Sequence, residues 1–225
     1  MFKYIVMNHI PRCGGSSIRK SFYDAYKNHK YFGKCPAYIS EYTHNNISLY
    51  HNPELIIAIH PKTTIFIDHS YSLFIENNFN LPIHETYRIL TIRNPIDRIL
   101  SHMFYFYKQD IDNLSKIVVN KFIADFGNLT IDYLTKYKYT TESLKTRFNK
   151  ARKELESYNF IFKTEEQILI EDFNTNNPFE LHLENNHIQR TKIEYRKNIS
   201  KKVIDHIKQN IPLEIKLLEN YYVDI

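Results

Sequence analysis

Short apolar runs alternate with stretches of helical periodicity along most of the chain. The runs are bounded by turn-forming residues, which is typical of buried strands; they occupy residues 4–7, 55–60, 64–69, 87–92 and 158–162. Apolar residues three and four positions apart predict helices over residues 18–28, 95–104, 115–158 with breaks near 127 and 139, 200–210 and 212–221. This alternation predicts an α/β domain of three layers, with a central, mainly parallel sheet flanked by helices.

The junction between the first strand and the first helix carries a clear chemical signal. Gly14 and Gly15 form a tight turn there, followed by two serines. Free N–H groups and the helix dipole make a helix N-terminus an anion-binding site, and glycines let a phosphate approach the backbone. Arg12 adds a positive charge just before the glycines. The segment predicts a phosphate-binding loop over residues 12–17; a glycine turn before an ordinary helix is the alternative interpretation.

This loop differs from the P-loop that binds ATP. That P-loop has the pattern G-x-x-x-x-G-K-[ST], in which the lysine reaches the β- and γ-phosphates. Here no lysine stands between Gly15 and Ser16, and the cation lies before the glycines, at Arg12. The difference argues against ATP and favours a nucleotide whose reactive group lies over the start of the loop.

A second strand–turn–helix junction, at residues 87–104, has a different set of polar residues. Arg93 stands at the strand end, and Pro95 suits the first turn of the helix. Ser101 follows about two helical turns later, so Arg93 and Ser101 could hold one phosphate. Arg98 is a candidate second cation. A strand followed by an amphipathic helix with a surface arginine is the alternative interpretation.

Composition fits one globular domain over residues 1–225. The chain is 43% hydrophobic and long enough to bury a full core. A net charge of +5 favours anionic ligands, but the sequence has no recognisable nucleic-acid module, and we expect no nucleic-acid partner. The two cysteines form no metal-ligand pattern. Oligomeric state cannot be read from the sequence.

We expect no membrane span and a cytoplasmic location. The N-terminal residues lack the basic segment and the following apolar stretch of a signal peptide. No apolar run approaches the roughly 20 residues that a membrane-spanning helix needs.

Two segments resemble a known enzyme family. Residues 9–17, H-I-P-R-C-G-G-S-S, closely resemble the 5′-phosphosulfate loop H-I-P-K-T-G-G-T-S of sulfotransferases that use 3′-phosphoadenosine 5′-phosphosulfate (PAPS). Residues 93–101, R-N-P-I-D-R-I-L-S, resemble the 3′-phosphate motif R-[DN]-P-x-x-R-x-x-S of the same family. Residues 155–166 and 187–200 resemble a further strand and the loop that covers the nucleotide. The carbohydrate-type branch, which includes heparan sulfate 2-O-sulfotransferases, is the most similar.

The resemblance implies a P-loop-like fold and a set of nucleotide-binding residues. Arg12 and Cys13 replace the usual lysine and threonine, and only Arg12 touches the chemistry. The implied binding residues are Arg12, Cys13, Gly14, Gly15, Ser16 and Ser17 around the 5′-phosphosulfate, Arg93 and Ser101 on the 3′-phosphate, and Arg190 and Thr191 in the covering loop.

The implied reaction transfers a sulfuryl group from PAPS to a hydroxyl acceptor by in-line displacement, with no metal required. Arg12 and the N–H groups of residues 14–17 would stabilise the charge on the leaving phosphate oxygen. Histidine suits a general base because its pKa lies near neutrality. The resemblance implies His69 as that base, with Asp68 or Glu85 as its partner. Alternative bases are His9, His60 and His102.

The acceptor and three further functions stay open. The branch favours a carbohydrate hydroxyl, while a small-molecule hydroxyl or a peptide tyrosine would make the protein another kind of O-sulfotransferase. A P-loop kinase acting on a small molecule is disfavoured by the missing lysine. A nucleotide-binding module without catalysis is disfavoured by the intact set of Arg12, Arg93, Ser101 and a candidate base.

Overall fold

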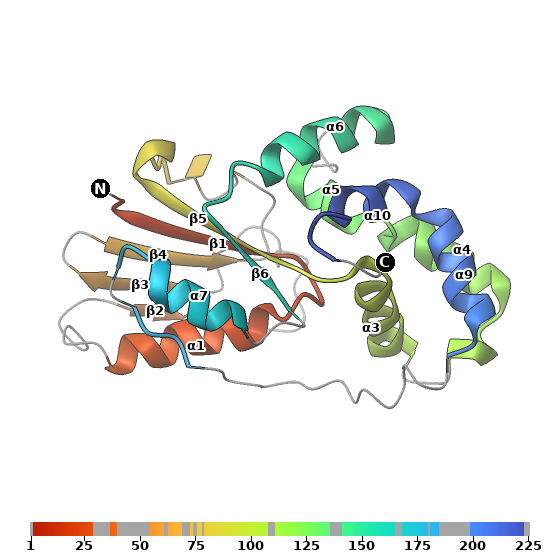
Figure 1. Ribbon diagram of the computed structural model, residues 1–225, viewed down its shortest axis with the longest axis horizontal. Helices are drawn as coiled ribbons and strands as arrows, with labels where there is room; N and C mark the ends of the chain where they lie inside the picture. The colour runs from red at the N-terminus through yellow and green to blue at the C-terminus, as the bar shows by residue number, and fades with distance from the viewer. Residues whose placement is uncertain are drawn as a thin grey trace. The chain divides into compact units, whose positions relative to one another are not determined.

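The fold is seen in a computed structural model that describes most of the chain as two compact units (Figure 1). The sheet unit comprises residues 1–92 and 156–189, and the helical unit comprises residues 93–155 and 190–225. A domain can contain more than one compact unit, so the single domain over residues 1–225 stays a prediction. The structure describes residues 2–28, 37–39, 55–60, 63–68, 73, 76–77, 79–107, 111–135, 141–164, 168–179, 181–184 and 199–222.

The sheet unit is built on a six-stranded sheet with the strand order β2-β3-β4-β1-β5-β6. The four strands β4, β1, β5 and β6 run parallel, and β2 and β3 are antiparallel. A connection of two residues joins β3 to β4, and so short a link permits only an antiparallel hairpin. The strands are β1 (Tyr4–His9), β2 (Ala37–Ile39), β3 (Leu55–His60), β4 (Thr63–Asp68), β5 (Thr86–Ile92) and β6 (Phe160–Lys163).

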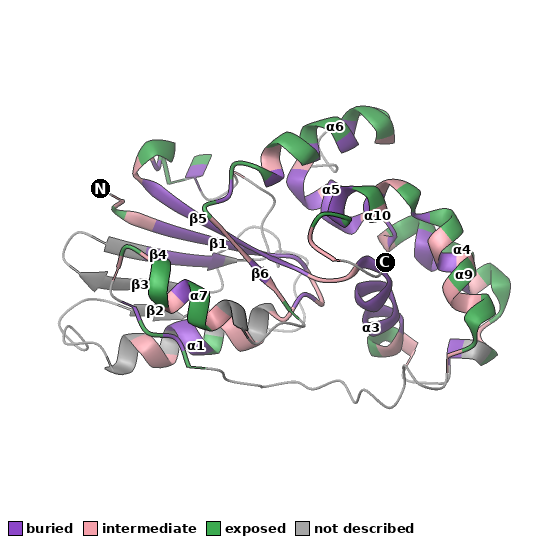
Figure 2. Ribbon diagram, viewed as in Figure 1, coloured by how far each residue is buried: buried purple, intermediate pink, exposed green. Residues whose placement is uncertain are grey.

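Strands β1 and β5 are buried along almost their whole length (Figure 2). Two helices, α1 (Gly15–Asn28) and α7 (Ile168–Asn176), pack on one face of the sheet. Their rings meet where Phe22 of α1 contacts Phe173 of α7, with ring centroids 5.6 Å apart. The prediction of an α/β fold with a mainly parallel sheet flanked by helices is confirmed. Helix α7 was not predicted from the sequence.

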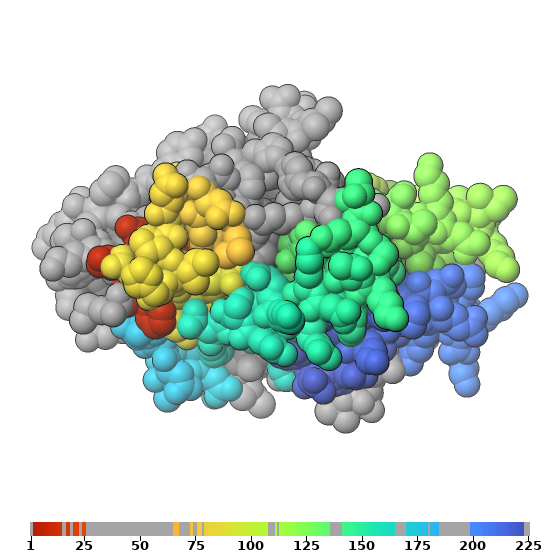
Figure 3. All heavy atoms as spheres, turned by 90° about the horizontal axis from the view of Figure 1, so that it is seen from above, coloured from red at the N-terminus to blue at the C-terminus, as the bar shows by residue number. Residues whose placement is uncertain are grey.

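The helical unit contains six described α-helices around its own apolar core. Ile99 and Met103 pack there with Phe122 and Ile207. Helix α10 packs against α6 (Figure 3) and α5. The helices are α3 (Pro95–Tyr107), α4 (Lys116–Phe126), α5 (Leu129–Thr135), α6 (Leu144–Leu155), α9 (Lys201–Asn210) and α10 (Pro212–Leu218).

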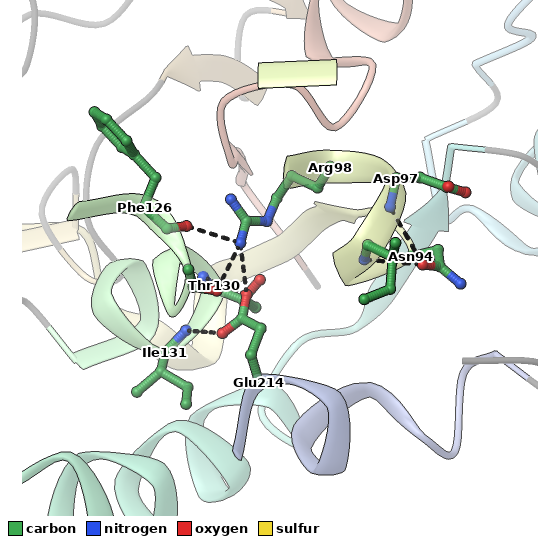
Figure 4. Close-up of polar contacts among 9 residues, drawn as sticks. Asn94, Asp97, Arg98, Phe126, Thr130, Ile131 and Glu214 are labelled. Atoms are coloured by element: carbon green, nitrogen blue, oxygen red, sulfur yellow. Dashed lines mark hydrogen bonds and ion pairs between the residues drawn. The ribbon is translucent and has the colours of Figure 1, made fainter. Parts of the chain in front are cut away.

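A buried ion pair and its hydrogen bonds join four helices of this unit, α3, α4, α5 and α10 (Figure 4). Arg98 Nη2 lies 3.3 Å from Glu214 Oε1 and donates to the carbonyl oxygens of Phe126 and Gly127 at the end of α4. The Glu214 carboxylate accepts from the N–H groups of Thr130 and Ile131 in the first turn of α5. Each charge therefore lies at the helix end that the helix dipole favours.

Within the part of the chain that the structure describes, every helix is too short or too polar to cross a membrane. The cytoplasmic location stays a prediction.

Candidate functional site

The segment after β1 turns sharply through two residues in the left-handed region. Arg12 has a φ of 69° and Gly14 a φ of 72°, and between them the Cys13 N–H donates to the Ile10 carbonyl oxygen at 3.0 Å. A Cβ at Gly14 would lie 2.9 Å from Thr164 Cγ2, which is closer than real Cβ contacts come. Position 14 therefore favours glycine, both for its backbone conformation and for the space around it.

This turn leads directly into the N-terminus of α1. The Gly14 carbonyl oxygen accepts from the N–H groups of Ser17, at 3.0 Å, and Ile18, at 3.3 Å. The N–H groups of Gly15 and Ser16 lie in the first helical turn, where the helix offers no acceptor. These two groups suit an anion. The Ser17 N–H already donates to Gly14, so the expectation that all four N–H groups of residues 14–17 would be available to a ligand is wrong for Ser17.

The side chains of the loop are placed differently from one another. Cys13 is buried, with 1% of its surface exposed, so any contact that it makes with a ligand would come from its backbone. Arg12 and Ser17 are half-buried. The Ser16 side chain lies outside the described residues.

The carboxyl ends of three parallel strands lie side by side at this edge of the sheet. In the strand register, His9 of β1 is beside Thr91 of β5, and Asn8 of β1 is beside Asp68 of β4. Ligands of α/β sheets bind beyond such carboxyl ends. The predicted phosphate loop follows β1, and Arg93 follows the last residue of β5.

The residues after β5 explain why the R-N-P pattern opens a helix. Asn94 Oδ1 accepts from the N–H groups of Ile96, at 3.0 Å, and Asp97, at 3.4 Å (Figure 4). Asn94 is thus the N-cap of α3, and Pro95 fills the first helical position, where a missing N–H costs nothing. Arg93 is half-buried, and Ser101 is fully buried in α3.

Arg98 does not have the role considered for it from the sequence. Its side chain is fully buried, and it binds Glu214 and the end of α4. It is a structural cation of the helical unit, so the interpretation of Arg98 as a second phosphate-binding cation is wrong.

Two residues considered for the proton transfer, Glu85 as the partner of His69 and His60 as an alternative base, lie at the opposite edge of the sheet from the predicted phosphate loop. Glu85 precedes β5 and binds Lys3 at 2.6 Å, and this hydrogen bond lowers the pKa of Glu85. Seven strand residues, about 20 Å, separate Glu85 from the carboxyl edge, so the prediction of Glu85 as a partner is wrong. His60, paired with Thr63, also lies at the amino edge.

The structure also describes the two remaining candidate bases, His9 and His102. His9 is buried at the end of β1. His102 lies in α3 and packs against Phe122 and Phe126, with ring centroids 5.3 and 4.6 Å away. His69, Arg190 and Thr191, and the side chain of Asp68, lie outside the described residues, and their roles stay predictions.

Sequence reasoning missed a buried polar network behind the end of β1. The Tyr158 hydroxyl donates to Asn8 Oδ1 at 3.0 Å, and the Arg88 guanidinium lies 4.3 Å from the Tyr158 ring centroid. Arg88 also donates to Glu76 Oε1 at 3.0 Å and to Ser157 Oγ at 2.5 Å. The network ties β5 and the start of β6 to the strand that carries the loop, and no local pattern links residues so far apart.

Comparison of the chain with protein-family models and with curated proteins found no match. The described residues bring together no group of three His, Cys, Asp or Glu side chains that could hold a metal ion. That the reaction needs no metal stays a prediction.

Proposed function

We propose that this protein is a sulfotransferase that transfers the sulfuryl group of PAPS to a hydroxyl acceptor. One observation carries the proposal: β1 and β5 are parallel neighbours, and each leads directly into one of the two segments that resemble the phosphate-binding motifs of these enzymes. A three-layer, P-loop-like fold is part of the same proposal.

The local geometry of the first segment fits a 5′-phosphosulfate. A glycine that accepts no Cβ, followed by a helix N-terminus, allows close approach of an anion to the backbone. When bound, PAPS supplies an activated sulfuryl group. The N–H groups of Gly15 and Ser16 would orient it, and the Arg12 guanidinium would neutralise charge on the departing phosphate oxygen. Arginine is always charged and donates to two oxygens, so it can replace lysine electrostatically.

The second segment would supply the 3′-phosphate contacts through side chains. Arg93 would bind this phosphate as a charge-assisted donor. The family resemblance implies the Ser101 hydroxyl as a second donor, although the Ser101 side chain is fully buried in this structure. Arg190 and Thr191 would cover the nucleotide, as the family resemblance implies. His69 would take the proton of the acceptor hydroxyl. The carbohydrate-type branch favours a sugar hydroxyl as the acceptor.

Isothermal titration tests the nucleotide. The ligands are 3′-phosphoadenosine 5′-phosphate (PAP), adenosine 5′-phosphate, ADP and ATP, each with and without Mg²⁺. We expect PAP to bind most tightly and independently of metal. Arg93→Ala should weaken PAP binding by about ten- to a hundredfold, the range for charged hydrogen bonds, and leave adenosine 5′-phosphate unaffected. Arg152→Ala, at an exposed arginine of α6, is the matched control.

Two outcomes would overturn the proposal. Preference for ATP with Mg²⁺ would favour a small-molecule kinase. Tight PAP binding without transfer from PAPS to any hydroxyl in a broad acceptor screen would favour a non-catalytic binding module. Once an acceptor is found, His69→Ala should lower turnover without changing PAP affinity; unchanged turnover would remove His69 from the mechanism.

A further inference from the structure

Thr164, the first residue after β6, donates two hydrogen bonds to the same backbone carbonyl oxygen. Its N–H and its Oγ1 both donate to the carbonyl oxygen of Ile92, at 3.1 and 2.9 Å. Ile92 is the last residue of β5 and precedes Arg93. The Ile92 carbonyl and the Arg93 N–H belong to one planar peptide unit. Thr164 therefore fixes the peptide plane from which Arg93 begins.

The other branch of the same side chain faces the glycine loop. Thr164 Cγ2 would lie 2.9 Å from a Cβ at Gly14, and its Oγ1 would lie 3.3 Å from it. The threonine thus fills the space beside Gly14 that a larger residue there would need. One small side chain thus lies near the ends of two neighbouring strands: its hydroxyl bonds to the last residue of β5, and its methyl carbon is the atom nearest to the position that a Cβ at Gly14 would take.

We propose that Thr164 is a positioning residue that sets the geometry of both phosphate-binding segments, with its hydroxyl serving the 3′-phosphate side and its methyl group the 5′ side. This inference rests on the proposed function. Threonine suits the position because the two tasks need a hydroxyl and a methyl group on one branched carbon. Serine and valine each keep only one of these groups, so substitution can separate the two tasks.

The test compares PAP with adenosine 5′-phosphate, which lacks the 3′-phosphate. Thr164→Val keeps a branched apolar side chain but loses the bond to Ile92. We expect its affinity for PAP to fall about fivefold, the loss of one neutral hydrogen bond, with little change for adenosine 5′-phosphate. Thr164→Ser keeps the hydrogen bond but loses the methyl group, and its affinities for PAP and for adenosine 5′-phosphate should fall by a similar factor.

Thr175→Val is the matched control. The Thr175 hydroxyl also donates to a carbonyl oxygen, that of Glu171 in α7 at 2.9 Å, within the same sheet unit. This variant should bind both nucleotides as the wild type does. Urea unfolding of each variant measures stability separately from affinity, and Thr164→Ser still tests the methyl half if Thr164→Val does not fold.

The possible results distinguish the two proposals. Wild-type protein that binds neither nucleotide would overturn the proposed function, and the role of Thr164 with it. Wild-type protein that binds PAP tightly, with Thr164→Val and Thr164→Ser keeping the wild-type affinities for both ligands, would overturn only the role of Thr164. If Thr164→Val lowered the affinities for PAP and for adenosine 5′-phosphate equally, the effect would be purely structural, and the proposed role of Thr164 would also be overturned.

Discussion

The N-termini of α5, α3 and α1 differ in the acceptors that they offer to the N–H groups of their first turns. In α5 the first turn donates to the carboxylate of Glu214, which comes from α10. In α3 it donates to the side chain of Asn94. In α1 the N-cap position is Gly14, which has no side chain and offers only its carbonyl oxygen, to Ser17 and Ile18. The N-terminus of α1 therefore suits an external anion.

The difference also tells how the second phosphate would be held. Because Asn94 already occupies the first N–H groups of α3, a phosphate near that helix would depend on side chains such as Arg93. At α1 the backbone itself would contribute. The two motifs share a strand–turn–helix form, and under the proposed function they would provide different kinds of anion site.

The largest loss of stability should come from removing the carboxylate of Glu214 from the N-terminus of α5. Glu214→Ala leaves Arg98 buried and unpaired, and loss of one partner of a buried pair costs about 3–5 kcal/mol of unfolding free energy. Urea unfolding measures the change. Glu219→Ala, at an exposed residue just after α10, should stay within about 0.5 kcal/mol. A loss below 1 kcal/mol in Glu214→Ala would mean that this helix end does not depend on its carboxylate.

The charge of Glu214 also affects the pKa of Asp132 in α5, so the pH dependence of stability provides a second test. Burial raises the pKa of Asp132 to about 6 from 3.8, with Arg147 opposing and Glu214 adding to the rise. The folded state thus holds the proton more tightly. Asp132 stabilises the fold fully below pH 3.8, and this contribution is lost as the pH rises to about 6.

Unfolding free energies of wild type and Asp132→Asn between pH 3.5 and 7 test this sign. Each pH unit between the two pKa values corresponds to about 1.4 kcal/mol, so the upper limit is about 3 kcal/mol. The difference, wild type minus variant, should fall as the pH rises through this window. The fall should be smaller in a Glu214→Gln background, where the neighbouring negative charge is gone. A flat difference would contradict the raised pKa.

Arg12→Ala tests the open N-terminus of α1. We expect PAP affinity to fall by about ten- to a hundredfold, because a charged hydrogen bond to the 5′-phosphate is lost. Adenosine 3′-phosphate, which lacks that group, should bind as before. Arg12→Lys should retain most of the affinity, and Lys20→Ala, on an exposed residue of α1 paired with Asp24, serves as the control. Equal losses for both nucleotides would argue against a 5′-phosphate at this helix end.

The smallest effect should come from the cap of α3. Asn94→Ala should lower the unfolding free energy by about 1 kcal/mol, and Asn94→Asp should preserve it because aspartate caps as well as asparagine. Asn149→Ala, at an exposed position inside α6, should not destabilise the protein. Destabilisation by Asn94→Asp equal to that by Asn94→Ala would refute the cap.

The elements that could be predicted from the sequence are those marked by a local pattern of residues. The buried strands β1 and β5 are continuous apolar runs, and Pro95 marks the start of α3, so their positions could be predicted. The nine residues of α7 include β-branched and asparagine residues that favour helix weakly. Its place is set by the packing of Phe173 in the sheet-unit core, which the local pattern does not encode.

The same distinction applies to the candidate site. Residues 12–17 and Arg93 could be identified because each stands beside a strand end in the sequence. The burial of Arg98 depends on Glu214, 116 positions along the chain, and the place of Thr164 beside Gly14 depends on the pairing of β5 with β6. Such contacts form only when distant segments come together.

The place of β1 in the strand order has a consequence for biosynthesis. β1 precedes its partners in the chain, yet it lies between β4 and β5, so Tyr4 must wait for Thr64 and Thr86 before its backbone is paired on both sides. Contacts between such distant segments slow folding and leave an apolar strand exposed meanwhile. A nascent chain that stalls before residue 86 would present β1 with an open edge, and we expect such chains to depend on chaperones and to aggregate without them.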